Sequence, residues 1–188
     1  WAFGWGYDDS LLAERRHPTR EDLDRVSRDR PIVILHVSGH LAVGNSAALA
    51  EAGITAETPD PPGGQIRRGP DGREPTGVVE EAALAPLAAR SPLATPPAPA
   101  ALARALAVYA QNGFTTVQDG ASSPPGIAAL TRFASERTPT LDVVFYPQIQ
   151  KVDQPLPDAP VGVYRNRLKL GGVKLILDGS PQGKTAYL

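Results

Sequence analysis

Hydrophobic and polar positions follow different patterns on the two sides of a proline-rich stretch, Ser91–Ala100. Before it, Pro31–Val37 is a run of apolar and β-branched residues that predicts a strand. The aromatic segment Trp1–Tyr7 predicts a short strand leaving a core. Gln65–Arg68 and the residues from Arg73 onward flank a Pro-Asp-Gly turn, which predicts a hairpin. We therefore place a domain boundary at the proline-rich stretch.

Capping residues predict the helices of the first half. Thr19, with Asp22 three residues later, is typical of an N-cap with a capping box, and it predicts a short helix. Asn45 is placed to cap a helix over Ala47–Ala52. A further helix is predicted over Val78–Ala89.

After the boundary, helix and strand patterns alternate. Apolar residues at positions i, i+3, i+4 and i+7 predict a helix over Pro99–Asn112. The remaining predicted elements are a strand at Phe114–Val117, a helix at Gly126–Arg137, a strand at Leu141–Ile149 and a strand at Leu170–Leu177. This order favours a parallel sheet, in either a barrel or a doubly wound fold.

Composition narrows the function classes. The chain has 188 residues, with 19 Lys and Arg against 20 Asp and Glu, so its charge of −1 gives no basis for attracting nucleic acid. No stretch approaches the about 18 apolar residues of a membrane span, and the start lacks the features of a signal peptide. The absence of Cys excludes disulfides and thiolate metal sites. Because Met is absent even at position 1, we expect an internal segment of a longer protein. A cytoplasmic location is our separate expectation.

Lys174 is the first chemical candidate. It lies inside the apolar run Val173–Leu177, and burying a lysine there is costly unless the amine is paired or modified. Its amine could form a Schiff base, clamp an anion, or react with carbon dioxide to give a carbamate that bridges two metals. Equally, the stem could pack while the amine reaches the end of the sheet.

Two other candidates follow strands. His40 lies in a Ser-Gly-His turn after a strand, where it is well placed to touch a ligand. Asp119 is expected at the carboxyl end of a strand, where barrel and open-sheet enzymes place their sites. We expect His36 to be a hydrogen-bonded core residue and His17 to lie at the surface. Most of the other acidic candidates are expected to be solvated or to cap helices: Asp8, Asp9, Glu80 and Glu81.

A nucleotide site is the competing interpretation of the C-terminal residues. Gly183-Lys184-Thr185 follows a predicted strand, as in a phosphate-binding loop. However, Asp178 stands where that motif has its first glycine, and its carboxylate would repel phosphate. We therefore do not favour a nucleotide-binding module.

Five segments together resemble amidohydrolase family 3, within the metal-dependent amidohydrolases that include N-substituted formamide deformylases. They are GWGYDD (Gly4–Asp9), the segment His17–Leu49, EPTGVVEEAA (Glu74–Ala83), GFTTVQDGA (Gly113–Ala121) and GGVKLILDGSPQGKTAYL (Gly171–Leu188). The similarity extends over nearly the whole chain in the right order.

The resemblance implies an α/β fold, a partial TIM-type (β/α)₈ barrel with an inserted α+β subdomain. Residues 1–97 would form the insertion after barrel strand 1, and residues 98–188 the barrel segment with strands 2 to 4. Those strands would be Phe114–Asp119, Leu141–Ile149 and Leu170–Leu177.

The resemblance also implies a divalent metal, zinc, and hydrolysis of a non-peptide C–N bond in a small molecule by metal-activated water. Lys174 matches the carboxylated lysine that binds the metal, whereas no His-x-His motif occurs in the chain. His40 and Asp178 match family positions that would line the substrate pocket, and Asp119 is the further pocket candidate from its expected place at a strand end. An inactive fragment is the alternative, and homo-oligomerisation is left open.

Overall fold

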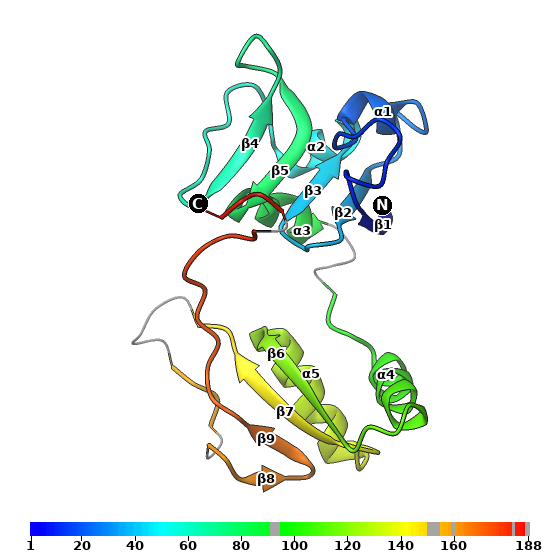
Figure 1. Cartoon of the computed structure of the whole chain (residues 1–188), viewed down its shortest axis with the longest axis vertical. Coiled ribbons are helices and arrows are strands. Elements are labelled where there is room, and N and C mark those ends of the chain that lie inside the picture. The colour runs from blue at the N-terminus through cyan, green and yellow to red at the C-terminus, as the bar shows by residue number, and fades with distance from the viewer. Residues whose placement is uncertain (91–94, 150–154, 159–160, 182, 187–188) are drawn as a thin grey trace. The chain divides into compact units, whose positions relative to one another are not determined.

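Two compact units make up the chain (Figure 1). The computed structural model describes residues 1–90, 95–149, 155–158, 161–181 and 183–186. The first unit contains Trp1–Thr95 together with Asp178–Leu188, and the second contains Pro96–Leu177. The assignment of residues 1–97 to an insertion and of 98–188 to a barrel stays a prediction.

A five-stranded sheet forms the centre of the first unit, in the order β1-β2-β3-β5-β4. The strands are β1 (Ala2–Tyr7), β2 (Ile32–His36), β3 (Leu41–Gly44), β4 (Gly64–Arg68) and β5 (Pro75–Glu81). β1 pairs with β2 in parallel, and the other pairs are antiparallel. The predicted strands at the start of the chain and at Pro31–Val37, and the predicted hairpin, are therefore confirmed.

Short helices cover the sheet of the first unit. They are α1 (Arg20–Asp24), α2 (Ser46–Ala52), the 3₁₀ helix η1 (Ala82–Leu84) and α3 (Ala85–Arg90). The capping box forms, since the Thr19 amide donates to the Asp22 carboxylate over 2.8 Å. Asn45 caps α2 by accepting a hydrogen bond from the Ala48 amide over 2.9 Å. Both caps confirm the sequence prediction.

The predicted helix over Val78–Ala89 is wrong in its first part. Residues up to Glu81 belong to β5, and helical structure begins only at Ala82. Val78 and Val79 lie opposite Val43 and Ala42 of β3, a strand that the sequence patterns missed. Both valines are buried, so pairing with β3 outweighs the local helical pattern.

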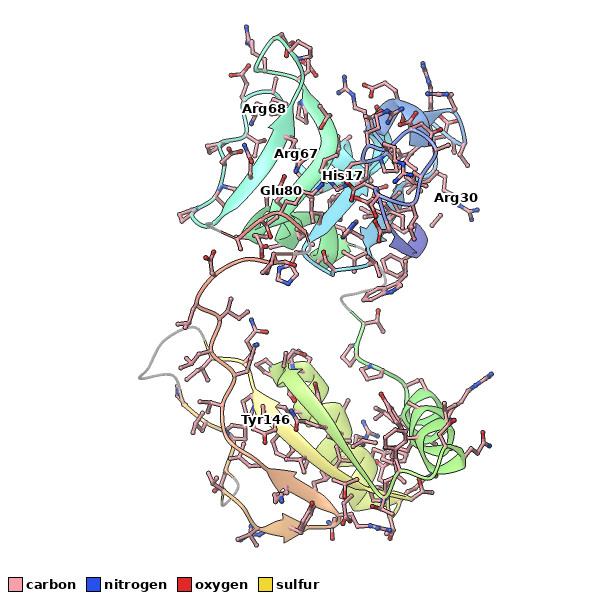
Figure 2. The ribbon with its side chains drawn as sticks, viewed as in Figure 1. His17, Arg30, Arg67, Arg68, Glu80 and Tyr146 are labelled. Carbon is pink, nitrogen blue, oxygen red and sulfur yellow. The ribbon has the colours of Figure 1, made fainter. Side chains whose placement is uncertain are left out.

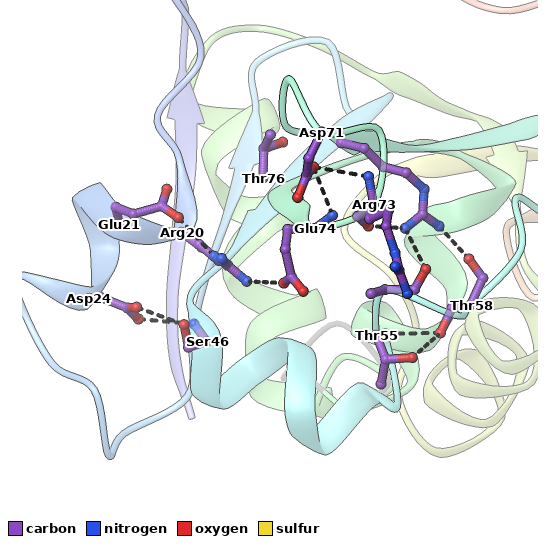
Figure 3. Close-up of polar contacts among 12 residues, drawn as sticks. Arg20, Glu21, Asp24, Ser46, Thr55, Thr58, Asp71, Arg73, Glu74 and Thr76 are labelled. Carbon is purple, nitrogen blue, oxygen red and sulfur yellow. Dashed lines mark hydrogen bonds and ion pairs between the residues drawn. The ribbon is translucent and has the colours of Figure 1, made fainter.

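The sheet of the first unit is covered on both faces. Val33 and Leu35 of β2 belong to the cluster that contains residues of α2 and α3, whereas Ile32 belongs to the cluster with Leu23 of α1. Alternate residues of a strand point to opposite faces, which explains why nearly all of β2 is apolar. Polar contacts add to this packing: Ser46 donates to Asp24, and Arg20 pairs with Glu74 (Figure 3).

The second unit contains a four-stranded sheet in the order β6-β7-β9-β8. Its elements are α4 (Pro99–Gln111), β6 (Thr116–Ser122), α5 (Pro124–Glu136), β7 (Asp142–Pro147), β8 (Tyr164–Arg165) and β9 (Leu168–Leu170). β6, β7 and β9 are parallel, and their order in the sheet follows their order in the chain. This confirms the predicted alternation of helices with parallel strands.

The predicted buried strand at Leu170–Leu177 is largely wrong. β9 ends at Leu170, and the next pairing is an isolated bridge of Lys174 with Gln148, the residue after β7. Gly171 separates the two pairings: a Cβ there would lie 2.6 Å from atoms of Val144 and of Tyr146. The apolar side chains beyond it are exposed, with Leu177 at 96%. Lys174 is itself exposed, so the free-energy cost of burying a lysine does not apply to it.

Candidate functional site

Three residues from distant segments meet in the first unit. The ring of His40, directly before β3, places Nδ1 at 2.8 and 3.0 Å from the two carboxylate oxygens of Glu81. Glu81 is the last residue of β5, and its carboxylate also accepts a hydrogen bond from the hydroxyl group of Thr185. The amide of Glu81 donates to the carbonyl of His40 over 3.0 Å. Backbone and side chains therefore fix this histidine–carboxylate pair together.

The backbone of Glu81 has an unusual conformation. Its φ of 49° and ψ of −121° lie in a region that side chains with a Cβ rarely adopt. Such conformations cost about 1–3 kcal/mol and persist where surrounding contacts enforce them, often at functional sites. Here the turn joins β5 to η1 and aims the carboxylate at His40.

A second polar cluster surrounds the end of β1. His36 is buried, with Nε2 3.2 Å from Asp9 and Nδ1 2.8 Å from the Ser38 hydroxyl. Its ring lies edge-on to those of Tyr7 and His17, with centroids 5.1 and 5.7 Å away. The expectation of a hydrogen-bonded core histidine is confirmed for His36. The expectation of a surface position is wrong for His17, because these rings pack over it.

Burial controls protonation in this cluster. It raises the pKa of the Tyr7 hydroxyl far above its ordinary value, with the Asp9 carboxylate contributing, and it lowers the pKa of His17. The Tyr7 hydroxyl group and the His17 ring share a hydrogen bond, with 3.2 Å between the hydroxyl oxygen and Nδ1. Figure 2 shows His17 near Arg67 and Glu80, which form an ion pair. Glu80 is buried, which corrects the expectation that it is solvated.

One group of metal-ligating side chains occurs in the described part of the chain: Asp8, Asp9 and His36. Both ring nitrogens of His36 already have hydrogen-bond partners, and the Lys184 ammonium lies 3.9 Å from Asp9. The Asp8 carboxylate accepts hydrogen bonds from the amide and hydroxyl groups of Ser10. A metal would have to displace these partners, so the group does not fit a metal centre.

Lys174 and Asp119 belong to the second unit, Asp119 within β6 and Lys174 in an isolated bridge after β9. Lys174 is exposed; its amide donates to the carbonyl of Pro147, the last residue of β7, and its carbonyl accepts from the amide of Ile149. Asp119 is an exposed residue of β6, and it pairs with Phe145 of β7. Lys174 instead pairs with Gln148. Phe145 and Gln148 are three residues apart, which corresponds to about 10 Å along an extended chain. The structure does not bring the two side chains together.

Asp178 begins the segment that returns to the first unit. The following turn is closed internally, because the Gly183 amide donates to the Ser180 hydroxyl and the Thr185 amide to the Ser180 carbonyl. A phosphate-binding loop needs these amides for its ligand. This internal bonding counts against a nucleotide site on Gly183-Lys184-Thr185.

Sequence reasoning did not predict the contact of Glu81 with Thr185, which it considered only as part of a phosphate-binding loop. Glu81 stood among the acidic residues expected to be solvated or to cap helices, and the structure corrects that expectation. One signal was present: His40, Glu81 and Thr185 come from three of the five segments that carry the family resemblance.

The fold is similar to part of two solved structures. A crystal structure of an uncharacterised metal-dependent hydrolase from Pyrococcus horikoshii OT3 aligns with a TM-score of 0.60 at 24% identity, over 95% of this chain and 34% of that one. The corresponding protein from Pyrococcus furiosus gives a TM-score of 0.57 at 26% identity, over 95% and 35%. The model of the amidohydrolase family matches residues 1–188, and the chain therefore belongs to this family.

Curated relatives agree with this assignment. An N-substituted formamide deformylase from Arthrobacter pascens is 43% identical over 83 residues, which is 44% of this chain and 15% of that protein. The putative amidohydrolase YtcJ from Bacillus subtilis (strain 168) is 40% identical over 79 residues, 42% and 15%. The matched part is thus a small share of each relative. Among the described residues, no helix is both long and apolar enough to cross a membrane.

Proposed function

We propose that this chain is part of a metal-dependent hydrolase that cleaves a C–N bond other than a peptide bond, of the amide or formamide type, in a small molecule. The observation that carries the proposal is the family match over residues 1–188. The name of the Arthrobacter pascens relative supports the formamide class.

The second unit would be an arc of a (β/α)₈ barrel. β6, β7 and β9 would be barrel strands 2, 3 and 4, with residues 1–97 as the insertion before them. Two features support this: the three strands are parallel, and they are adjacent in chain order. Barrel enzymes place their sites at the carboxyl ends of the strands, which is where Lys174 pairs with β7.

Lys174 would bind a divalent metal, zinc, as a carboxylated lysine. Its exposed side chain gives the amine access to carbon dioxide. The described residues do not complete a metal centre around it, since their one ligand group is Asp8, Asp9 and His36. The other ligands would have to come from further segments of a longer protein, and we derive no metal-dependent step from this chain. His40, Asp178 and Asp119 would contribute to the substrate pocket.

The test is Lys174→Ala in the full-length protein. Bound metal, measured by plasma mass spectrometry, and hydrolysis of an N-substituted formamide should be lost together. Lys169→Ala is the matched control: this lysine lies over the Tyr164 ring, 4.5 Å from its centroid, and should leave metal content and turnover intact. Full metal content and turnover in Lys174→Ala would refute the role of Lys174.

A further inference from the structure

The ring of His40 is held on one side and open on the other. Nδ1 faces the Glu81 carboxylate at 2.8 and 3.0 Å, and the side chain is 34% exposed. Within the described ranges, Nε2 has no hydrogen-bond partner in the structure. The side chain is therefore anchored by one nitrogen while the other stays available to a ligand.

The partner of Nδ1 determines where the proton lies. An ionised carboxylate only accepts hydrogen bonds, so Nδ1 must carry the hydrogen. The hydroxyl group of Thr185 also donates to this carboxylate, so both groups that face it act as donors. In the neutral ring the lone pair then lies on Nε2, the open nitrogen.

We propose that Glu81 and Thr185 are positioning residues that hold His40 in this tautomer, so that Nε2 accepts a hydrogen bond from the N–H group of a secondary amide substrate. The identity of the substrate rests on the function proposed above, whereas the tautomer does not. A substrate nitrogen without hydrogen cannot make this bond. The site should therefore prefer a mono-substituted formamide to a di-substituted one.

The tautomer can be measured without turnover. In the full-length protein labelled with ¹⁵N-histidine, two-bond ¹H–¹⁵N correlation spectra at pH 8 should show His40 with the hydrogen on Nδ1. Glu81→Gln should yield a mixture of tautomers, because an amide can both donate and accept. Thr185→Val should move the ring nitrogen shifts in the same direction, and Thr185→Ser should restore them.

Glu51→Gln is the matched control for this measurement. The Glu51 carboxylate accepts a hydrogen bond from Trp1 and lies on α2. The Glu51→Gln substitution should leave the spectrum of His40 unchanged. A wild-type ring with its hydrogen on Nε2, or an unchanged tautomer in Glu81→Gln, would overturn the positioning role.

Substrate preference tests the ligand. In the full-length protein, kcat/KM for an N-alkylformamide should exceed that for the N,N-dialkylformamide by at least about tenfold, because one hydrogen bond is lost. Folded His40→Leu, checked by its thermal transition, should reduce this ratio toward one, whereas Glu51→Gln should keep it. An unchanged ratio in His40→Leu would refute the contact. If the wild-type protein hydrolyses neither compound, the proposed function and the substrate contact both fail, and the spectra still decide the positioning role.

Discussion

The carboxylate of Glu81 accepts a hydrogen bond from the hydroxyl group of Thr185, 104 positions further along the chain. The contact attaches the segment after Lys174 to the first unit, together with the approach of Lys184 to Asp9. Gly183, which belongs to the same C-terminal segment, packs beside Leu41 of β3. Glu81 precedes the second unit in the sequence and Thr185 follows it, so the contact joins two segments that the second unit separates.

Gly179→Ala tests how this segment is built. A Cβ at Gly179 would lie 2.3 Å from the carbonyl oxygen of Thr185, so the turn must open. We expect amide hydrogen exchange at residues 180–186 to accelerate by at least about tenfold, equal to a local loss of about 1.4 kcal/mol. Gly120→Ala is the control, since its Cβ would meet only the Gln118 side chain at 3.6 Å. Equal exchange in both variants would contradict the close packing of Gly179.

Asn45→Ala should be among the most damaging single changes in the first unit. The side chain is fully buried, accepts from the amides of Ile32 and Ala48, and donates to the carbonyls of Ser27 and Arg30. Removing it leaves buried backbone groups unpaired, so we expect a loss of about 3–5 kcal/mol.

Urea unfolding followed by tryptophan fluorescence measures this loss, because both tryptophans, Trp1 and Trp5, lie in the first unit. Thr58→Ala is the control: its hydroxyl bonds are exposed, and its cost should stay below about 1 kcal/mol. A cost for Asn45→Ala no larger than that of the control would contradict the proposed weight of the buried bonds.

The ion pair of Arg67 and Glu80 should behave non-additively. Glu80 is buried, so Arg67→Met leaves a carboxylate without its partner and should cost about 3 kcal/mol. Replacing both residues with Met removes the unpaired charge, and the double variant should be more stable than Arg67→Met alone. The same fluorescence titration compares them, and a double variant that is less stable than Arg67→Met would disprove this expectation.

Stability should fall as the pH drops, in part because of His17. Burial lowers its pKa below the ordinary value of 6.5, so the unfolded chain binds a proton there more readily than the folded chain. The contribution of a neutral His17 is present above pH 6.5 and is lost as the pH falls through the folded-state pKa. His17→Gln should show a smaller decrease in melting temperature between pH 7.5 and 5.5 than the wild type. An identical decrease would show that His17 does not contribute.

Local sequence signals predicted local structure well. Thr19 with Asp22 and Asn45 mark caps that form within four residues, and β2 is recognisable because a strand buried on both faces is continuously apolar. Tertiary pairing overrode local pattern at Val78 and Val79, which join β3 instead of a helix. Spacing along the chain could not predict the contact of Glu81 with Thr185, because it depends on the whole path between them. For Lys174, an apolar neighbourhood in sequence did not mean burial in space.

The discontinuous first unit has a consequence for synthesis on the ribosome. Its chain leaves at Thr95 and returns at Asp178, so all of Pro96–Leu177 is translated between its two parts. Thr185 is translated 104 residues after Glu81. At a translation rate of about 5–20 residues per second, the delay between the two residues is roughly 5–20 s. The first unit is therefore completed after the second, and His40 gains its contact with the Glu81–Thr185 pair only once the second unit has been made.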